Sequence, residues 1–177
     1  PIGIPMLFAD LETMDVITPV EAYHDFYSCI AAGARGIVIF SYWHKRDLPV
    51  LQKTWEAYAK AGSESNGEEG LGDVILWGED LPKPTVAIAK GPQQTAPFAP
   101  YGHAYEVRYP SVNVLAKRYE EQTYLIAVNS SERAVTAEIA GLEGTEAAVL
   151  FEDRTVEIVD GKLVDEFGWL GVHVYRM

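Results

Sequence analysis

The chain has 177 residues, of which 48% are hydrophobic and 23% are charged, and this composition predicts one globular domain or two small ones rather than a disordered chain. Only 14 residues are Lys or Arg against 26 that are Asp or Glu, and the formal net charge of -12 excludes binding to a nucleic-acid backbone, which needs clustered basic residues. No apolar run approaches the roughly 20 residues of a membrane-spanning helix, so no membrane partner is expected.

The first third of the chain predicts a strand followed by a helix. Residues 6–9 form a short apolar run that is typical of a buried strand. The helix is predicted to begin at Thr18, which can cap the first turn, with Pro19 in the first helical position and Glu21 placed to complete a capping box. Apolar residues then recur at helical spacing as far as Ala34.

A second strand and helix follow. The apolar residues of the run 36–40 do not alternate with polar ones, which indicates a strand covered on both faces, as parallel strands are. Asp47 is predicted to cap a helix that continues to Ala59. Two strand–helix units do not complete a parallel sheet, so polypeptide outside this chain is expected to cover Val38. Because the sequence starts at Pro1 without Met, we interpret it as a fragment or a processed product.

The composition changes after the second helix. The Gly-, Ser- and Glu-rich residues 63–72 are predicted to link a first domain, 1–62, to a second domain, 73–177. In the second domain, turn signals such as the hairpin pair Asp160 and Gly161 separate short runs of strand character, which is typical of an antiparallel β-sandwich. The predicted strands are 73–77, 86–89, 104–109, 112–119, 123–129, 134–139, 147–151, 155–159, 162–165 and 172–176.

Two stretches of the sequence resemble a known family. The segment PVEAYHDFYSCIAAGARGIVIFSYWH, residues 19–44, is similar to the last two strand–helix units of a (β/α)8-barrel glycoside hydrolase. The segments TYLIAVNSSERAVTAEIAGLEG, residues 123–144, and GVHVYRM, residues 171–177, resemble the small β-sandwich that follows the barrel in many of these enzymes. The resemblance implies a mixed fold class, in which two β-α units of a TIM-type barrel precede an all-β antiparallel sandwich.

The resemblance also implies where a sugar site would lie. Active sites of such barrels occupy the carboxyl ends of the strands. There Glu12 would be the nucleophile, with Asp10 on the same stretch competing for the role, and Trp43 would form a stacking floor beside Tyr42 and His44. An alternative interpretation of Glu12 is a loop carboxylate that caps the next segment. Because glycoside hydrolysis needs a second carboxyl group, which would lie on an earlier strand, the chain alone is predicted to be inactive.

Aromatic residues of the second domain are further candidates for stacking on sugars, because their rings offer flat apolar faces. Tyr101 and Trp169 are predicted to be the exposed carbohydrate-binding pair, since both lie in Gly-containing turns. For Trp77, Phe98 and Tyr105, packing in the core is the favoured interpretation.

Other chemistries have no support in the sequence. No histidine pair has metal-ligand spacing and Cys29 is the single cysteine, so no metal is predicted. No cofactor is predicted either, because no Gly-rich phosphate loop follows a strand. The triplet that starts at Asn129 matches the N-glycosylation pattern, but a tight turn explains it equally well.

Three functions remain open. The favoured one is the C-terminal fragment of a glycoside-hydrolase-like protein, whose sandwich stabilises the barrel and binds polysaccharide or oligosaccharide. The alternatives are a freestanding, non-catalytic carbohydrate-binding module and a structural or assembly domain. The apolar strands of a partial barrel also favour association between copies of the chain, so a homo-oligomer is expected.

Overall fold

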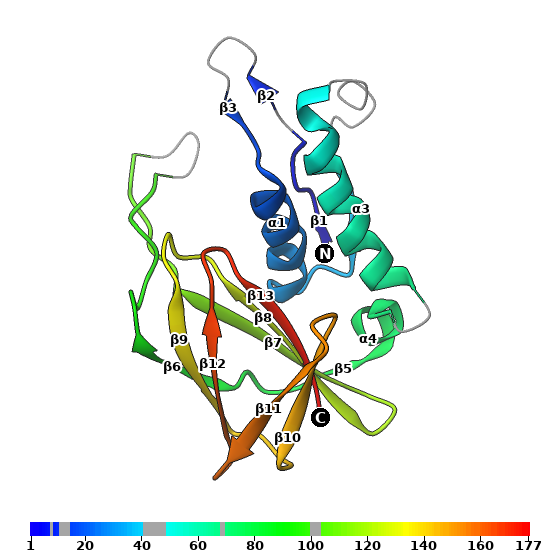
Figure 1. Cartoon of the computed structure of the whole chain (residues 1–177), viewed down its shortest axis with the longest axis vertical. Helices are drawn as coiled ribbons and strands as arrows, with labels where there is room; N and C mark the ends of the chain where they lie inside the picture. The colour runs from blue at the N-terminus through cyan, green and yellow to red at the C-terminus, as the bar shows by residue number, and fades with distance from the viewer. Residues whose placement is uncertain (8, 11–14, 41–48, 68–69, 100–103) are drawn as a thin grey trace. The chain divides into compact units, whose positions relative to one another are not determined.

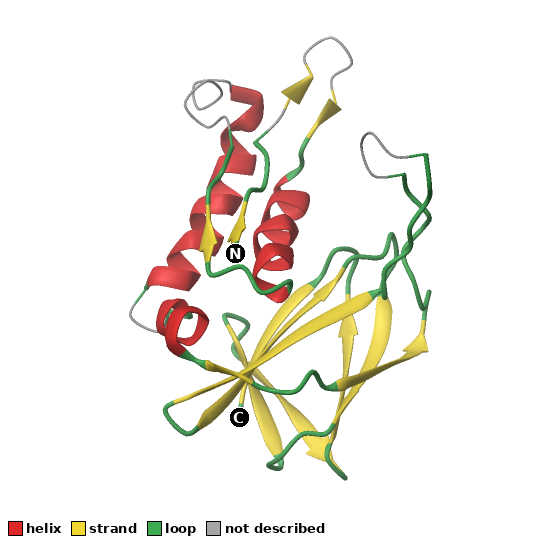
Figure 2. Cartoon of the chain, turned by 180° about the vertical axis from the view of Figure 1, so that it is seen from behind, coloured by secondary structure: helices red, strands yellow, loops and turns green. Residues whose placement is uncertain are grey.

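The computed structural model describes residues 1–177 except 8, 11–14, 41–48, 68–69 and 100–103. The chain divides into two compact units, unit 1 from Pro1 to Glu79 and unit 2 from Asp80 to Met177 (Figure 1). All described helices belong to unit 1, whereas unit 2 consists of strands and loops (Figure 2). No helix in the described part of the chain has the length and hydropathy to cross a membrane.

Unit 1 contains two strand–helix units, as the sequence predicts. Its central strands are parallel neighbours, and a bridge between Met6 and Phe40 continues the pairing in the same direction. A short antiparallel pair precedes the first helix. The elements are β1 (Ile2–Gly3), β2 (Ala9–Asp10), β3 (Asp15–Val16), α1 (Pro19–Ala31), β4 (Gly36–Ile37), the 3-10 turn η1 (Pro49–Leu51), α3 (Gln52–Asn66) and α4 (Gly72–Trp77).

The capping box predicted for the first helix is confirmed. The Thr18 backbone N–H donates to the Glu21 carboxylate at 2.8 Å, and the Glu21 N–H donates to the Thr18 hydroxyl at 3.3 Å. These reciprocal bonds satisfy two backbone donors that a helix start otherwise leaves without partners. The second helix, α3, begins at Gln52 without a side-chain cap, and the predicted cap, Asp47, lies outside the described residues.

Two predictions near the division of the chain differ from the structure. The run 73–77, predicted as a strand, is the helix α4, and this prediction was wrong because a short apolar run has no periodicity that separates helix from strand. The chain divides between Glu79 and Asp80, while α3 includes residues 63–66 of the stretch predicted as a linker.

A buried carboxylate joins α1 to α3. The hydroxyls of Tyr23 and Tyr27 both donate to Oε2 of Glu64 at 2.8 Å, and Nζ of Lys60 lies 3.6 Å from Oε1. Tyr27 is fully buried, and burial raises the pKa of its hydroxyl above the ordinary value, with the nearby tyrosine and carboxylate adding to the shift. The phenol therefore stays protonated and remains a donor to Glu64.

The two faces of the parallel strand pair differ in exposure. Alternate residues Gly3, Pro5 and Leu7 are buried, and the Tyr58 hydroxyl of α3 donates to the Met6 carbonyl at 2.8 Å. The opposite side chains are apolar and 47–66% exposed. They are Ile2, Ile4, Met6, Val38 and Phe40, and we call them the apolar strand face. In the described part of the chain, the strand around Val38 is therefore covered on one face.

Unit 2 holds most of a nine-stranded sheet. Its hydrogen-bonded order is β5-β7-β8-β13-β10-β11-β12-β9-β6, and neighbouring strands from β6 to β13 pair in antiparallel fashion. The strands are β5 (Glu79–Asp80), β6 (Thr85–Lys90), β7 (Val112–Tyr119), β8 (Gln122–Asn129), β9 (Val135–Ala140), β10 (Glu146–Leu150), β11 (Arg154–Val159), β12 (Lys162–Phe167) and β13 (Val172–Arg176).

The predicted mixed fold class is confirmed, and eight of the predicted strands match β6 to β13 closely. The strand predicted at 104–109 was wrong, because this segment makes only an isolated bridge between Phe98 and Val107. The strands follow one continuous order that curls around a shared core, as Figure 1 shows, rather than dividing into two separate sheets. The predicted hairpin is present, with positive φ at Asp160 (51°) and Gly161 (71°).

Candidate functional site

Most of the residues predicted for the barrel site lie outside the described part of the chain. These are Glu12, Tyr42, Trp43 and His44, and the same holds for Tyr101. Asp10, the competitor of Glu12, ends β2, whose backbone pairs with β3. The roles assigned to these residues stay predictions, and Trp169 is the predicted site residue that the structure describes.

Trp169 lies in the turn that joins β12 to β13. The turn is closed by a hydrogen bond of 3.0 Å from the Gly171 N–H to the Gly168 carbonyl, and Leu170 takes a positive φ of 52°. The indole is not packed in the core, since Trp169 is 48% exposed. The turn therefore presents a flat aromatic surface to the solvent at one end of unit 2.

A buried asparagine holds this turn in place. Asn129 is fully buried, and its Nδ2 donates to the carbonyls of Gly168 (2.8 Å) and Arg133 (2.9 Å). Its Oδ1 accepts from the N–H (3.0 Å) and the hydroxyl (2.7 Å) of Ser131. Both amide protons of Asn129 are thus used, so the tight-turn interpretation of the triplet is correct and a glycan cannot be attached in the folded chain.

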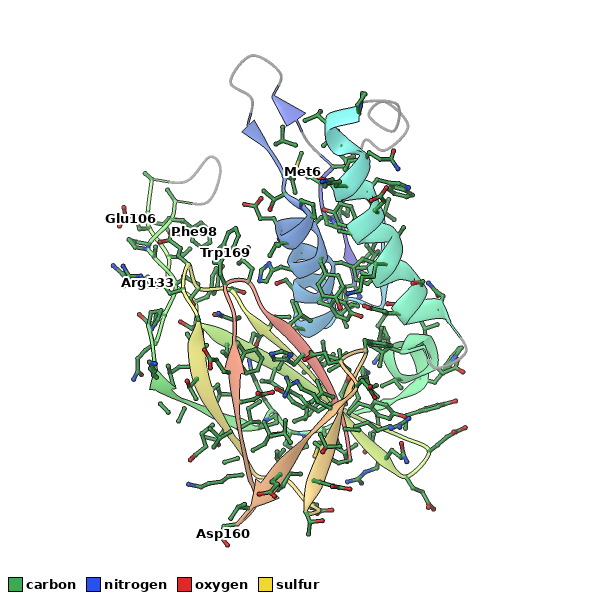
Figure 3. All side chains as sticks on the ribbon, viewed as in Figure 1. Met6, Phe98, Glu106, Arg133, Asp160 and Trp169 are labelled. Carbon is green, nitrogen blue, oxygen red and sulfur yellow. The ribbon has the colours of Figure 1, made fainter. Side chains whose placement is uncertain are left out.

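Ser111 connects the same region to two more segments. Its hydroxyl donates to the Pro92 carbonyl at 2.6 Å, its N–H donates to the Gln93 carbonyl at 3.0 Å, and its own carbonyl accepts from Ser130 at 2.8 Å. Four segments, 91–98, 105–111, 129–134 and 168–171, are therefore tied together, and we call them the loop end of unit 2. In Figure 3, Phe98, Arg133 and Trp169 lie at this end and Asp160 at the opposite one.

Further aromatic side chains are exposed at the loop end. Phe98 and Tyr109 lie on paired segments with ring centroids 5.6 Å apart, and both are exposed, as is Tyr105. The core packing favoured for Phe98 and Tyr105 was wrong, and it was also wrong for Trp77, which is 75% exposed in unit 1. Residue type alone does not distinguish these cases, because Trp, Phe and Tyr occur both in exposed loops and in protein cores.

An ionic cluster lies where β11 and β12 separate. The two strands pair at two positions beside their hairpin turn, and further along them the Arg154 guanidinium donates to the Asp165 carboxylate at 2.8 Å. The Tyr175 hydroxyl donates to the same oxygen at 2.8 Å. Arg154 also donates to Glu152, which contacts His173. Charged and polar side chains thus link β11, β12 and β13 where the backbone bonds between β11 and β12 end.

The hydrogen bonds of this cluster shift the pKa of Asp165. Burial on its own raises the pKa of the carboxyl, but the bonds from Arg154 and Tyr175 more than offset burial and hold the pKa below its ordinary value of 3.8. Burial and the Asp165 charge raise the pKa of the Tyr175 hydroxyl. The cluster is fully paired and suits a stabilising role. Among the described residues, no group of His, Cys, Asp and Glu is arranged to hold a metal ion.

No family model and no curated protein matches the sequence. Several solved structures resemble the fold at low identity. A noncanonic maltogenic α-amylase from Thermotoga neapolitana gives a TM-score of 0.57 at 10% identity, over 98% of this chain and 41% of that one. An Anoxybacillus α-amylase described as a new glycosyl hydrolase subclass gives a TM-score of 0.53 at 13% identity, over 89% of this chain and 32% of that one. The AmyP structure in complex with maltose gives a TM-score of 0.53 at 7% identity, over 99% of this chain and 39% of that one.

The chain spans about a third to two fifths of the solved structures that it resembles. At these identities the likeness concerns the fold. The arrangement of two strand–helix units followed by an antiparallel β unit is therefore one that also occurs within α-amylase structures, and the fold of this chain is glycoside-hydrolase-like.

Proposed function

We propose that this chain is part of a larger carbohydrate-active protein, in which unit 1 contributes two strand–helix units to a (β/α)8 barrel and unit 2 stabilises the barrel and binds polysaccharide or oligosaccharide. The observation that carries the proposal is the apolar strand face, which has no covering partner in the described part of the chain. Glu12 remains the proposed nucleophile of the complete protein, and the chain alone is proposed to be inactive.

The apolar strand face has the composition of a barrel interior. Helices cover one face of barrel strands, and branched apolar side chains from all strands fill the other. Ile2, Ile4 and Val38 are branched residues on the face that α1 and α3 leave open. Burying each such side chain contributes about 1.5 to 3 kcal/mol, so further strands of the same barrel are the covering elements that we propose.

Without those strands, copies of the chain are expected to associate through this face. Sedimentation velocity should show dimers or larger species, and the double variant Ile4→Ser/Phe40→Ser should shift the distribution towards monomer because it removes two exposed apolar side chains. Val164→Ser is the matched control, since Val164 is similarly exposed but lies on β12. A monomeric wild-type chain at high concentration would contradict the proposal.

Sugar binding is proposed to depend on Trp169 at the loop end. Three facts support this: the exposed indole, the aromatic pair Phe98 and Tyr109 on the same tied segments, and the bound maltose of the AmyP structure with a similar fold. Stacking a pyranose ring on an indole buries apolar surface on both partners. The other candidate sugar-binding residues, Tyr42, Trp43, His44 and Tyr101, remain proposals in the complete protein.

We expect Trp169→Ala to weaken the binding of oligosaccharides about tenfold, a change equivalent to about 1.4 kcal/mol. Affinity electrophoresis against starch, xylan and pectin, followed by calorimetry with oligomers of whichever binds, measures the effect. Trp77→Ala is the control, since it removes an exposed indole from unit 1. Equal binding by wild type and Trp169→Ala would refute the assignment, and a wild-type chain that binds no glycan would favour a structural domain.

A further inference from the structure

A hollow on the loop end combines two arginines with a rigid backbone. Its volume is about 510 Å³, within the roughly 300–1,000 Å³ of small-molecule pockets. Segments 91–97 and 131–134 form its walls, and Arg108 and Arg133 both line it. We propose that this hollow binds the carboxylate of an anionic saccharide, such as a hexuronate unit. The inference rests on the carbohydrate binding proposed above and names the class of sugar.

The two guanidinium groups are available for a ligand. Arg108 and Arg133 are exposed, and neither forms a salt bridge with another described residue, whereas Arg154 is engaged by two carboxylates. One acidic residue, Glu132, also lines the hollow. The net charge of -12 repels anions in general, but charges further away than about 8 Å are largely screened at physiological salt. The local pair of arginines therefore decides which ligands bind.

Both arginines project from backbone that is held firmly. The Arg133 carbonyl accepts from Nδ2 of Asn129 at 2.9 Å, and the Ser131 hydroxyl, with its one proton, lies 2.7 Å from both this carbonyl and Oδ1 of Asn129. Next to Arg108, the Tyr109 N–H donates to the Thr95 hydroxyl at 3.1 Å, and the Thr95 N–H donates to the Tyr109 carbonyl at 2.9 Å. The walls of the hollow thus need little ordering when a ligand binds, which lowers the entropic cost of binding.

Gly91 allows the walls to approach each other. It takes a φ of 100°, and a Cβ at this position would lie 2.7 Å from the Ala134 carbonyl oxygen. Any other residue would push segment 91–97 away from segment 131–134 and widen the hollow.

The chemistry of the lining favours a carboxylate over a neutral sugar. A guanidinium group offers a planar fork of donors that matches both carboxylate oxygens, and charge-assisted bonds of this kind are about twice as strong as neutral ones. A neutral hydroxyl could bond to one donor and would leave the charge of the second arginine uncompensated. Glu132 lines the same hollow, and its negative charge repels a carboxylate. It is therefore expected to lower the affinity for the anionic sugar.

The test compares trigalacturonic acid with its methyl ester, which keeps the sugar rings and removes the charge. Calorimetry with the full chain at about 0.15 M salt, where distant charges are screened, should give at least about tenfold tighter binding of the acid. Arg108→Gln and Arg133→Gln should each erase most of this preference, and Glu132→Gln should strengthen the binding of the acid severalfold. Arg118→Gln, which changes an exposed arginine on β7, should bind as wild type does.

The outcomes separate this inference from the proposed function. Equal affinity for acid and ester, with both lost in Trp169→Ala, would overturn the carboxylate site and leave the proposed sugar binding intact. Failure of both ligands to bind to a chain that still binds starch or xylan would overturn the carboxylate site alone, and failure of every glycan to bind would overturn the two together. A sulfated trisaccharide that binds as tightly as the acid would overturn the assignment to carboxylate. Thermal melting of each variant confirms folding, and a melting temperature equal to that of wild type assigns lost binding to the arginine itself.

Discussion

Replacing Asn129 with alanine should lower the free energy of unfolding of unit 2 by about 2 to 4 kcal/mol. The amide is fully buried and makes four hydrogen bonds, to Ser131, Arg133 and Gly168. Alanine would leave two carbonyls and two donors of other residues without this partner, and each buried group that loses its partner costs about 1 to 3 kcal/mol. Water that enters the vacated space should recover part of the loss.

Hydrogen exchange of the backbone amides of β8 and β13 measures this effect within unit 2. Gln93→Ala is the control, because Gln93 belongs to the same loop end but is exposed and bonds through its backbone carbonyl. The Trp169 turn should also lose protection, since one of its ties to β8 is removed, and sugar binding should weaken with it. Unchanged exchange rates in Asn129→Ala would contradict the scaffolding role.

Asp165→Asn should lower the stability of unit 2 by about 1 to 3 kcal/mol at pH 7. The substitution removes the charge that Arg154 pairs with and weakens the acceptor for the buried Tyr175 hydroxyl. About a third of the Arg154 side chain is exposed, so the guanidinium can turn towards water. The loss of stability is therefore expected to be smaller than that for a fully buried ion pair. Denaturant titration of wild type and variant measures the difference.

The same substitution should reduce the acid sensitivity of the chain. The folded-state pKa of Asp165 lies below the ordinary carboxyl value of 3.8, so its contribution is complete above that value and is lost as the pH falls through the folded-state pKa. The stability difference between wild type and Asp165→Asn should therefore shrink below about pH 4. Glu157→Gln, an exposed carboxylate on β11, is the control. A difference that stays constant down to pH 2 would refute the assignment.

The local sequence predicts elements whose signal is contained within a few residues. The strands from β6 to β13 follow from alternation and turn residues, and the capping box follows from Thr18 and Glu21. The prediction of a strand at 73–77 was wrong because its apolar residues fit a helical turn as well as a strand. The apolar strand face shows a second limit of prediction from local sequence. The non-alternating run around Val38 predicts a strand that is covered on both faces, but it does not identify the segment that covers the second face.

The loop end could not be assembled from the sequence because its contacts join distant segments. Asn129 and Gly168 are separated by 39 residues, and the bond between them depends on β8 and β13 lying side by side in the sheet. Arg108 and Arg133 likewise line the same hollow only because separate loops pack against each other. Trp169 could be recognised as an exposed aromatic, since its turn is local, but the neighbours of that turn depend on the strand order.

The carboxylate of Glu64 favours one alignment of the two helices of unit 1. Apolar side chains in a helix seam can interdigitate in more than one register, whereas two phenols that share one acceptor oxygen cannot. Sliding α3 by one turn, about 5.4 Å, would separate the Tyr23 and Tyr27 hydroxyls from Glu64, while Lys60 would move with the carboxylate because both lie on α3. In the proposed complete protein, further strands would therefore pack against a unit 1 whose two helices are already aligned.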